Sequence, residues 1–204
     1  MKIKIIIFIL AFMGILNILF IYFHIKNVNN NILINQKTIE IDKLKFENLK
    51  NKYFLEIKDN FFPFDPNMKI ISIQGDTLLF KEILSPRPKL IFSFSKLTCS
   101  SCVEKEILRI KNIESTFGFD NIIILTNYEH IRDIAMFCKL NNVKYPMYLI
   151  CKGLNLNVYQ NNLAHYFVVF DDFYLRDMYI VDQNSPDLTN KYLDEMLLKY
   201  FTYK

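Results

Sequence analysis

The longest apolar run of the chain lies at its N-terminus. Residues Ile5 to Phe23 include no charged side chain over 19 positions, and a helix that rises about 1.5 Å per residue would span roughly the hydrocarbon core of a bilayer over that length. Lys2 and Lys4 precede the run, and Tyr22 and Phe23 close it, as is typical of segments that meet a membrane interface. The pattern predicts a transmembrane helix within residues 1–26.

A cleaved signal peptide is the alternative to an anchor. It requires a shorter apolar region and a cleavage site of small residues, whereas the sequence after Phe23 reads HIKNVNNN. We therefore expect an uncleaved, single-pass anchor in the inner membrane, formed by residues 5–23, with the rest of the chain on the periplasmic side. Lys26 reduces the charge asymmetry that sets this orientation.

A polar segment follows the apolar run. Residues 27–60 are rich in Asn and Lys, and apolar side chains recur every seven residues at Ile32, Ile39, Phe46 and Tyr53. The candidate core positions between them include Asn35 and Asp42, which disfavours a stable coiled coil. The pattern predicts a helical spacer and leaves weak self-association open.

From residue 61 onward, short apolar runs alternate with segments of helical periodicity, which predicts one α/β domain over residues 61–204 with a mixed sheet. Gln74-Gly75-Asp76 marks a hairpin turn, and Pro186 suits the first position of a helix. Strands are expected over 69–73, 77–80, 90–94, 121–126, 148–151, 166–170 and 175–181, and helices over 103–117, 129–140 and 186–200.

The composition narrows the functional classes. The 19 Phe and 12 Tyr residues supply a core, whereas the 4 Gly residues form no phosphate-binding loop. The net charge of +4 comes without a long basic run, so the sequence does not predict nucleic-acid binding. No cofactor motif is present.

Two of the four cysteines, Cys99 and Cys102, form a C-x-x-C pair between a predicted buried strand and the following helix. At the start of a helix, unpaired N–H groups and the positive end of the helix dipole favour the thiolate, which is the reactive form. Cys102 follows one turn later on the same face. We expect Cys99 to be the attacking thiol and Cys102 the resolving thiol.

The segment FSFSKLTCSSCVEKEI, with its strand, C-x-x-C at a helix start and subsequent βα and ββα order, resembles membrane-anchored extracytoplasmic thioredoxin-like proteins of Bacteroidetes-type bacteria. The resemblance implies a thioredoxin-like fold, with a mixed sheet flanked by helices, over residues 61–204. It also implies thiol–disulfide exchange with protein or peptide thiols, without a cofactor. The alternative is a catalytically quiet thioredoxin-fold module that binds a partner in a cell-envelope assembly.

The sequence departs from the family pattern at two places. Thr98 precedes Cys99 where the family often has Trp, and Ser100-Ser101 replaces Gly-Pro between the cysteines. His165 follows Ala164 at the position where the family usually carries a cis-proline. Thr98, Ala164 and His165 are the candidate substrate-binding residues. His165 is interpreted either as a partly exposed loop residue or as an imidazole that faces Cys99 as an acid–base partner or metal ligand.

Other polar and sulfur-bearing side chains have simpler interpretations. Cys138 and Cys151 are expected to be small core residues, with a disulfide between them left open. Glu104 and Glu106 are expected on the solvated face of their helix, although a buried acid at this place could shuttle protons during exchange. We predict no metal site, because the C-x-x-C has no second pair at short spacing.

Overall fold

The computed structural model describes the chain except for residues 1, 85–86, 151–153, 155 and 203–204, and it leaves out the side chains of residues 2–12, 15, 18 and 159. The chain divides into two compact units, residues 1–51 and 52–204. Each is described by itself.

The first unit is helical throughout its described length and consists of α1 (Lys2–Asp59), whose last two turns belong to the second unit. The spacer predicted over residues 27–60 lies almost entirely within this helix. Across the part of the chain that is described, no helix is both long and apolar enough to cross a membrane. The anchor predicted over residues 5–23 falls largely on positions 5–12, 15 and 18, outside the described side chains, and it stays a prediction.

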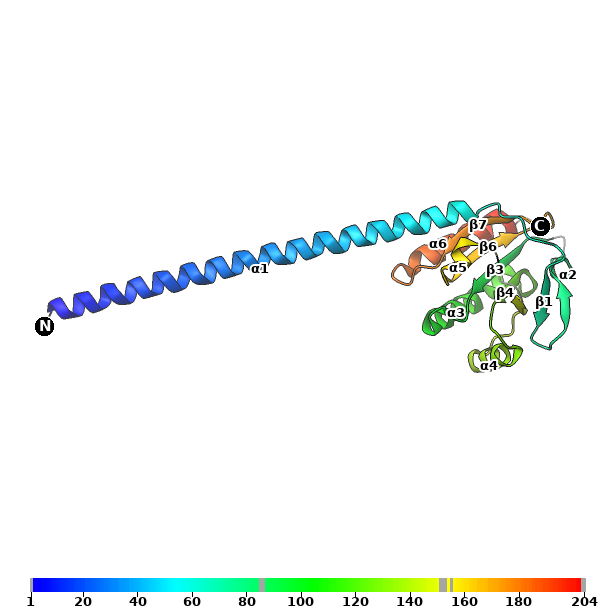
Figure 1. The fold of residues 1–204 in the computed structure, drawn as a ribbon, viewed down its shortest axis with the longest axis horizontal. Coiled ribbons are helices and arrows are strands. Elements are labelled where there is room, and N and C mark those ends of the chain that lie inside the picture. The colour runs from blue at the N-terminus through cyan, green and yellow to red at the C-terminus, as the bar shows by residue number, and fades with distance from the viewer. Residues whose placement is uncertain (1, 85–86, 151–153, 155, 203–204) are drawn as a thin grey trace. The chain divides into compact units, whose positions relative to one another are not determined.

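The second unit is built on one mixed seven-stranded sheet with the order β2-β1-β5-β4-β3-β6-β7 (Figure 1). The pairs β3–β4 and β4–β5 are parallel, and the other four pairs are antiparallel. All seven predicted strands are present. Their bounds are β1 (Lys69–Ser72), β2 (Thr77–Leu79), β3 (Lys89–Phe94), β4 (Ile122–Thr126), β5 (Met147–Ile150), β6 (His165–Val169) and β7 (Leu175–Ile180).

Four helices lie between the described strands: α2 (Phe80–Ile83), α3 (Ser100–Phe117), α4 (Ile131–Asn141) and α5 (Asn157–Gln160), with a 3-10 turn η1 (Phe119–Asn121) after α3. After β7 come α6 (Pro186–Met196) and a π-helical turn η2 (Leu197–Phe201). The predicted strand over 77–80 ends one residue early. The Leu79 N–H donates to the Glu82 carboxylate at 2.9 Å, so Phe80 already begins α2. The four-residue helices α2 and α5 are too short to show a helical period in the sequence.

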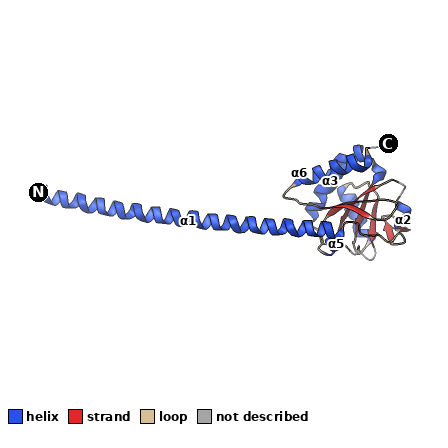
Figure 2. Cartoon of the chain, turned by 90° about the horizontal axis from the view of Figure 1, so that it is seen from above, coloured by secondary structure: helices blue, strands red, loops and turns tan. Residues whose placement is uncertain are grey.

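Alternating side chains of the central strands fill two hydrophobic cores, one on each face of the sheet. Phe92 of β3 and Tyr166 of β6 lie in the first core, which α3, α4 and α6 cover. Ile91 and Phe167, their neighbours in the chain, lie in the second core. In Figure 2, α3 and α6 lie on one side of the strands and α5 on the other.

Carboxylates attach the last turns of α1 to the rest of the second unit. The buried Asp59 accepts hydrogen bonds from the backbone N–H groups of Asn157 and Val158 at 3.1 and 2.8 Å, and so caps the start of α5. Glu56 accepts the Ile180 N–H at 2.8 Å, at the end of β7. These contacts explain why the compact unit begins before residue 61, where the sequence pattern of the domain starts.

Candidate functional site

Cys99 and Cys102 form a disulfide at the start of α3, just beyond the end of β3. Their Cα atoms are 5.2 Å apart, and the Cys99 carbonyl accepts the N–H groups of Cys102 and Val103 at 3.0 and 3.1 Å. Cys99 is exposed, whereas Cys102 is only 8% exposed. Of the two bonded cysteines, Cys99 therefore lies at the surface and Cys102 lies almost entirely beneath it.

A compact turn over residues 95–98 carries the chain from β3 to Cys99. The Ser95 N–H donates to Thr98 Oγ1 at 3.0 Å, and the Thr98 N–H donates to the Ser95 carbonyl at 3.0 Å. The Leu97 N–H donates to Ser95 Oγ at 3.2 Å, and the Leu97 side chain is 76% exposed. Hydrogen bonds within the turn therefore fix the residue that immediately precedes Cys99.

Asparagines from both strands that flank β3 hold this turn. Asn162, just before β6, accepts Ser95 Oγ–H on its side-chain Oδ1 at 2.8 Å and Thr98 Oγ1–H on its backbone carbonyl at 3.0 Å. Asn127, just after β4, accepts the Lys96 N–H on Oδ1 at 3.0 Å. Because β4 runs parallel and β6 antiparallel to β3, the end of one and the start of the other meet at the same edge of the sheet. Sequence reasoning missed both asparagines; their places next to strand ends were the available signal.

The three candidate substrate-binding residues lie in different environments. Thr98 is half-buried and engaged in the turn, and Ala164 is buried against the first core. His165 is fully buried in β6, where it pairs with Ser93 and stacks on Phe167 at 5.7 Å. Because it shares the side of the strand with Phe167, its imidazole lies on the sheet face opposite α3.

The interpretations of His165 as an exposed loop residue and as an imidazole facing Cys99 are therefore both wrong. The strand begins one residue earlier than its apolar run, which turns His165 into the second core. Its Nδ1 donates to the Leu163 carbonyl at 2.7 Å. Burial lowers the pKa of His165 to about 4, against smaller opposing contributions from that carbonyl and from Asp59. Every peptide bond that the structure describes is trans, including the one before His165.

Glu106 is not on the solvated face of α3, where we expected it. It is 3% exposed, and its Oε2 accepts the Tyr166 hydroxyl at 2.9 Å and Arg109 Nε at 3.0 Å. Burial of an acid at this position is possible because both partners face it. Glu104 is exposed, as expected.

Of the other two cysteines, Cys138 lies away from this site and Cys151 is not among the described residues. Cys138 is buried on α4 and its thiol is 3.4 Å from the Met147 sulfur, and burial raises the pKa of this thiol. Cys151, and with it the possible bridge to Cys138, lies outside the described residues. No group of three or more His, Cys, Asp or Glu side chains suited to a metal ion occurs in the described part of the chain.

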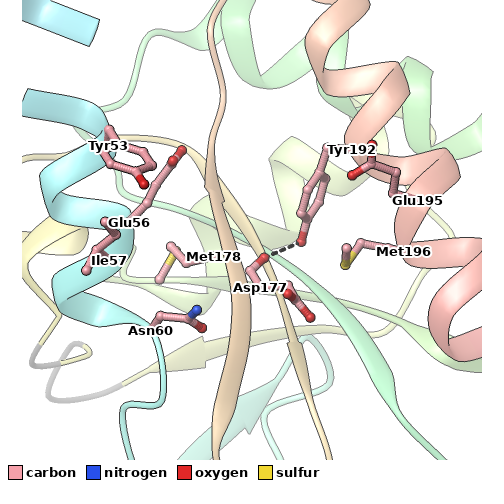
Figure 3. Close-up of a pocket in the computed structure, with 9 residues that line it drawn as sticks. All are labelled: Tyr53, Glu56, Ile57, Asn60, Asp177, Met178, Tyr192, Glu195 and Met196. Atoms are coloured by element: carbon pink, nitrogen blue, oxygen red, sulfur yellow. Dashed lines mark hydrogen bonds between the residues drawn. The ribbon is translucent and has the colours of Figure 1, made fainter. Parts of the chain in front are cut away.

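A cavity of about 260 Å³ lies between the end of α1, β7 and α6 and contains none of the predicted site residues (Figure 3). Its carboxylates include Glu56, whose pKa is raised by burial, and Asp177, which pairs with Lys199. Tyr192 donates to the Asp177 backbone carbonyl at 2.7 Å across the cavity wall. The lining residues are Tyr53, Glu56, Ile57, Asn60, Asp177, Met178, Tyr192, Glu195 and Met196.

No protein-family model and no curated protein matches this sequence. Solved structures do match. The bacterioferritin comigratory protein of Xanthomonas campestris, described with alkyl peroxide reduction activity, shares 11% identity at a TM-score of 0.50 over 67% of this chain and 98% of its own. A cysteine-to-serine mutant of peroxiredoxin Q from the same organism shares 12% identity at a TM-score of 0.50, covering 68% and 99%. A thioredoxin-like protein from Porphyromonas gingivalis shares 14% identity at a TM-score of 0.48, covering 71% and 97%. On the two matches at a TM-score of 0.50 and its own topology, the second unit of this chain has a thioredoxin-like fold, with a mixed sheet, flanking helices and a C-x-x-C pair at the start of α3.

Proposed function

We propose that this protein is a thiol–disulfide oxidoreductase that acts on protein or peptide thiols through Cys99 and Cys102. The observation that carries the proposal is the asymmetry of the disulfide at the start of α3, in which Cys99 is an exposed residue and Cys102 is nearly buried. The exposed cysteine is available to a partner, and the buried one is protected from it until the first bond forms.

The exchange proceeds through a mixed disulfide. In the reduced protein, the Cys99 thiolate attacks one sulfur of a substrate disulfide, and the other substrate sulfur leaves as a thiolate that takes up a proton. Cys102 then loses its proton, attacks Cys99 Sγ and releases the second substrate sulfur. Two electrons pass to the substrate, and the Cys99–Cys102 disulfide of the structure is formed. The reverse sequence oxidises a substrate dithiol.

The start of α3 stabilises the charged form of Cys99. As the residue before the first helical position, it lies next to backbone N–H groups that lack carbonyl partners within the helix. The positive end of the helix dipole favours an anion there. The same groups stabilise Cys99 as a leaving thiolate when another thiol attacks the mixed disulfide.

Insulin reduction tests the proposal with the full chain in detergent and dithiothreitol as the electron source. The wild type should accelerate precipitation of the insulin chains, and Cys99→Ser should abolish the acceleration. Cys138→Ser, which removes a buried cysteine away from the pair, is the matched control and should behave as the wild type. Equal rates for wild type and Cys99→Ser would reject exchange and favour the partner-binding module.

The same variants test peroxide as a competing substrate, because one structural neighbour is described with alkyl peroxide reduction. Cys99-dependent consumption of an alkyl hydroperoxide, without insulin reduction, would replace the proposed substrate class with peroxides.

The proposal includes a place for the reaction: the periplasmic side of the inner membrane, with residues 5–23 as a single-pass anchor. Its support is the uncharged run of 19 residues behind Lys2 and Lys4. In a Gram-negative host, the full chain with a C-terminal tag should resist carbonate extraction, and protease should remove the tag from intact spheroplasts. Release by carbonate would reject the anchor, and a protected tag in sealed spheroplasts would reject the orientation.

A further inference from the structure

The turn that positions Cys99 depends on a residue from a distant part of the chain. Asn162 lies 64 residues beyond Thr98 in sequence and contacts the turn twice, once through its side chain and once through its backbone. The side-chain Oδ1 binds the Ser95 hydroxyl at the start of the turn. The backbone carbonyl binds the Thr98 hydroxyl at its end, next to Cys99.

We propose that Asn162 is a positioning residue for Cys99, and this rests on the proposed exchange function. Thr98 is bonded covalently to Cys99, so the hydrogen bond from Thr98 to Asn162 fixes the residue that precedes α3. Cys99 stays exposed at the N-cap of α3 only if the turn over residues 95–98 stays bonded to Asn162. The loop before β6 thus holds the turn that precedes Cys99 through hydrogen bonds from Ser95 and Thr98, with a trans backbone and no proline.

The backbone conformation of residue 162 favours an asparagine at this position. Its φ of 56° lies in the left-handed region, which Asn adopts more readily than most other residues. Asn also supplies a neutral carbonyl acceptor for Ser95. Asp would supply an acceptor with a negative charge, which disfavours a thiolate nearby. Asn162 therefore combines the required backbone shape with an acceptor that does not oppose the reactive form of Cys99.

The pH profile of Cys99 alkylation tests this role, because it reports the thiolate and not the fold. The full chain in detergent carries Cys102→Ser, so that Cys99 is the exposed thiol among the described cysteines. Iodoacetamide is the probe, and mass spectrometry follows the modification of Cys99. We compare the parent with Asn162→Gly and Asn162→Asp. Asn162→Gly permits the same φ and keeps the backbone carbonyl that binds Thr98, but it removes the side-chain acceptor of the Ser95 hydroxyl. Asn162→Asp keeps both acceptors and adds a negative charge. Asn142→Gly is the control, because Asn142 has a similar φ of 49° but caps the end of α4.

Asn162→Asp and Asn162→Gly should each move the midpoint of the profile upward and lower the alkylation rate at pH 7 by about three- to tenfold, which corresponds to a shift of up to about one pKa unit. Asn142→Gly should leave the midpoint unchanged. Far-UV circular dichroism confirms that each variant is folded, and Asn162→Asp keeps the test available if the glycine variant is not.

Unchanged midpoints in the folded Asn162→Gly and Asn162→Asp variants would overturn the role of Asn162. This outcome is distinct from failure of the proposed function, since alkylation needs only a thiol. If the wild type reduces insulin and the midpoints do not move, the positioning role of Asn162 is rejected and the exchange function is kept. If the midpoints move but insulin is not reduced, the exchange function is rejected and the role of Asn162 in positioning Cys99 is kept.

Discussion

The hydroxyl group of Tyr166 donates a 2.9 Å hydrogen bond to the Glu106 carboxylate and so ties β6 to α3 one helical turn after Cys102. Arg109 completes the arrangement with a 3.0 Å ion pair to the same oxygen. Burial and the neighbouring carboxylate raise the pKa of Tyr166 well above its usual value, so the phenol stays protonated and keeps donating. A buried anion here is stable only while these two donors face it.

Tyr166→Phe should therefore lower the free energy of unfolding by about 1.5–3 kcal/mol, the range for a hydrogen bond to a charged group. The ring still fills the first core, so the loss reports the hydroxyl. Urea denaturation of the oxidised protein measures the change. The exposed Tyr174→Phe is the control and should be neutral. Equal stability of wild type and Tyr166→Phe would show that the bond contributes nothing net.

Cys99 and Cys102 should differ strongly in reactivity once the disulfide is reduced. Cys102→Ser leaves the exposed Cys99, and Cys99→Ser leaves a sulfur that is 8% exposed. Iodoacetamide should modify the first variant roughly tenfold faster than the second at neutral pH, because both exposure and the helix start favour Cys99. Mass spectrometry over a time course measures both rates, with the buried Cys138 as an internal slow reference. A faster reaction of Cys102 would reverse the assigned roles.

Most of the strand and helix order could be predicted because it depends on local pattern. The apolar run LIFSF predicts β3, and the alternation around Gly75, with its φ of 95°, predicts the hairpin of β1 and β2. The C-x-x-C spacing places both cysteines on one turn, since three residues are nearly one turn of a helix. These features need only neighbours in the chain.

What could not be predicted depends on contacts between distant segments. Glu106 looks like a surface residue among charged neighbours, and one of the two donors that make its burial possible, Tyr166, lies 60 residues later in the chain. His165 looks like a loop residue because the apolar run starts at Tyr166, but pairing with Ser93 extends β6 by one residue. Side chains alternate along a strand, so His165 lies on the face opposite Tyr166. Asn162 has only its place next to a strand end as a local signal, because its role comes from the distant turn at Ser95.

Asp59 should matter for the stability of the second unit although it lies at the end of α1. Its carboxylate accepts three N–H donors from Asn157 and Val158, at 2.6 to 3.1 Å, and is buried. Asp59→Ala should lower the free energy of unfolding by about 1–2 kcal/mol, as for loss of a helix cap. Thermal or urea unfolding measures it, with the exposed Asp42→Ala as the matched control on the same helix. A loss equal to that of Asp42→Ala would show that the cap does not stabilise the unit.

His165 should make the stability of the fold depend on pH below neutrality. Its pKa in the folded protein is about 4 because burial disfavours the charged imidazole. In the unfolded chain the value is about 6.5, so between these pH values the unfolded state binds one proton more than the folded state. Stability is therefore fully present above about pH 6.5 and declines as the pH falls toward 4, by up to about 1.4 kcal/mol per pH unit.

The variant His165→Asn tests this pH dependence, because Asn keeps a donor for the Leu163 carbonyl but does not titrate. Whatever its stability at pH 7, its unfolding free energy should fall less steeply than that of the wild type between pH 6.5 and 4. Chemical denaturation at half-unit pH steps measures both slopes. His130→Asn is the control and should follow the wild-type slope, since this histidine is exposed and not part of either core. Parallel curves for wild type and His165→Asn would show that His165 takes up its proton without leaving the fold, and that its burial does not set the acid stability of this domain.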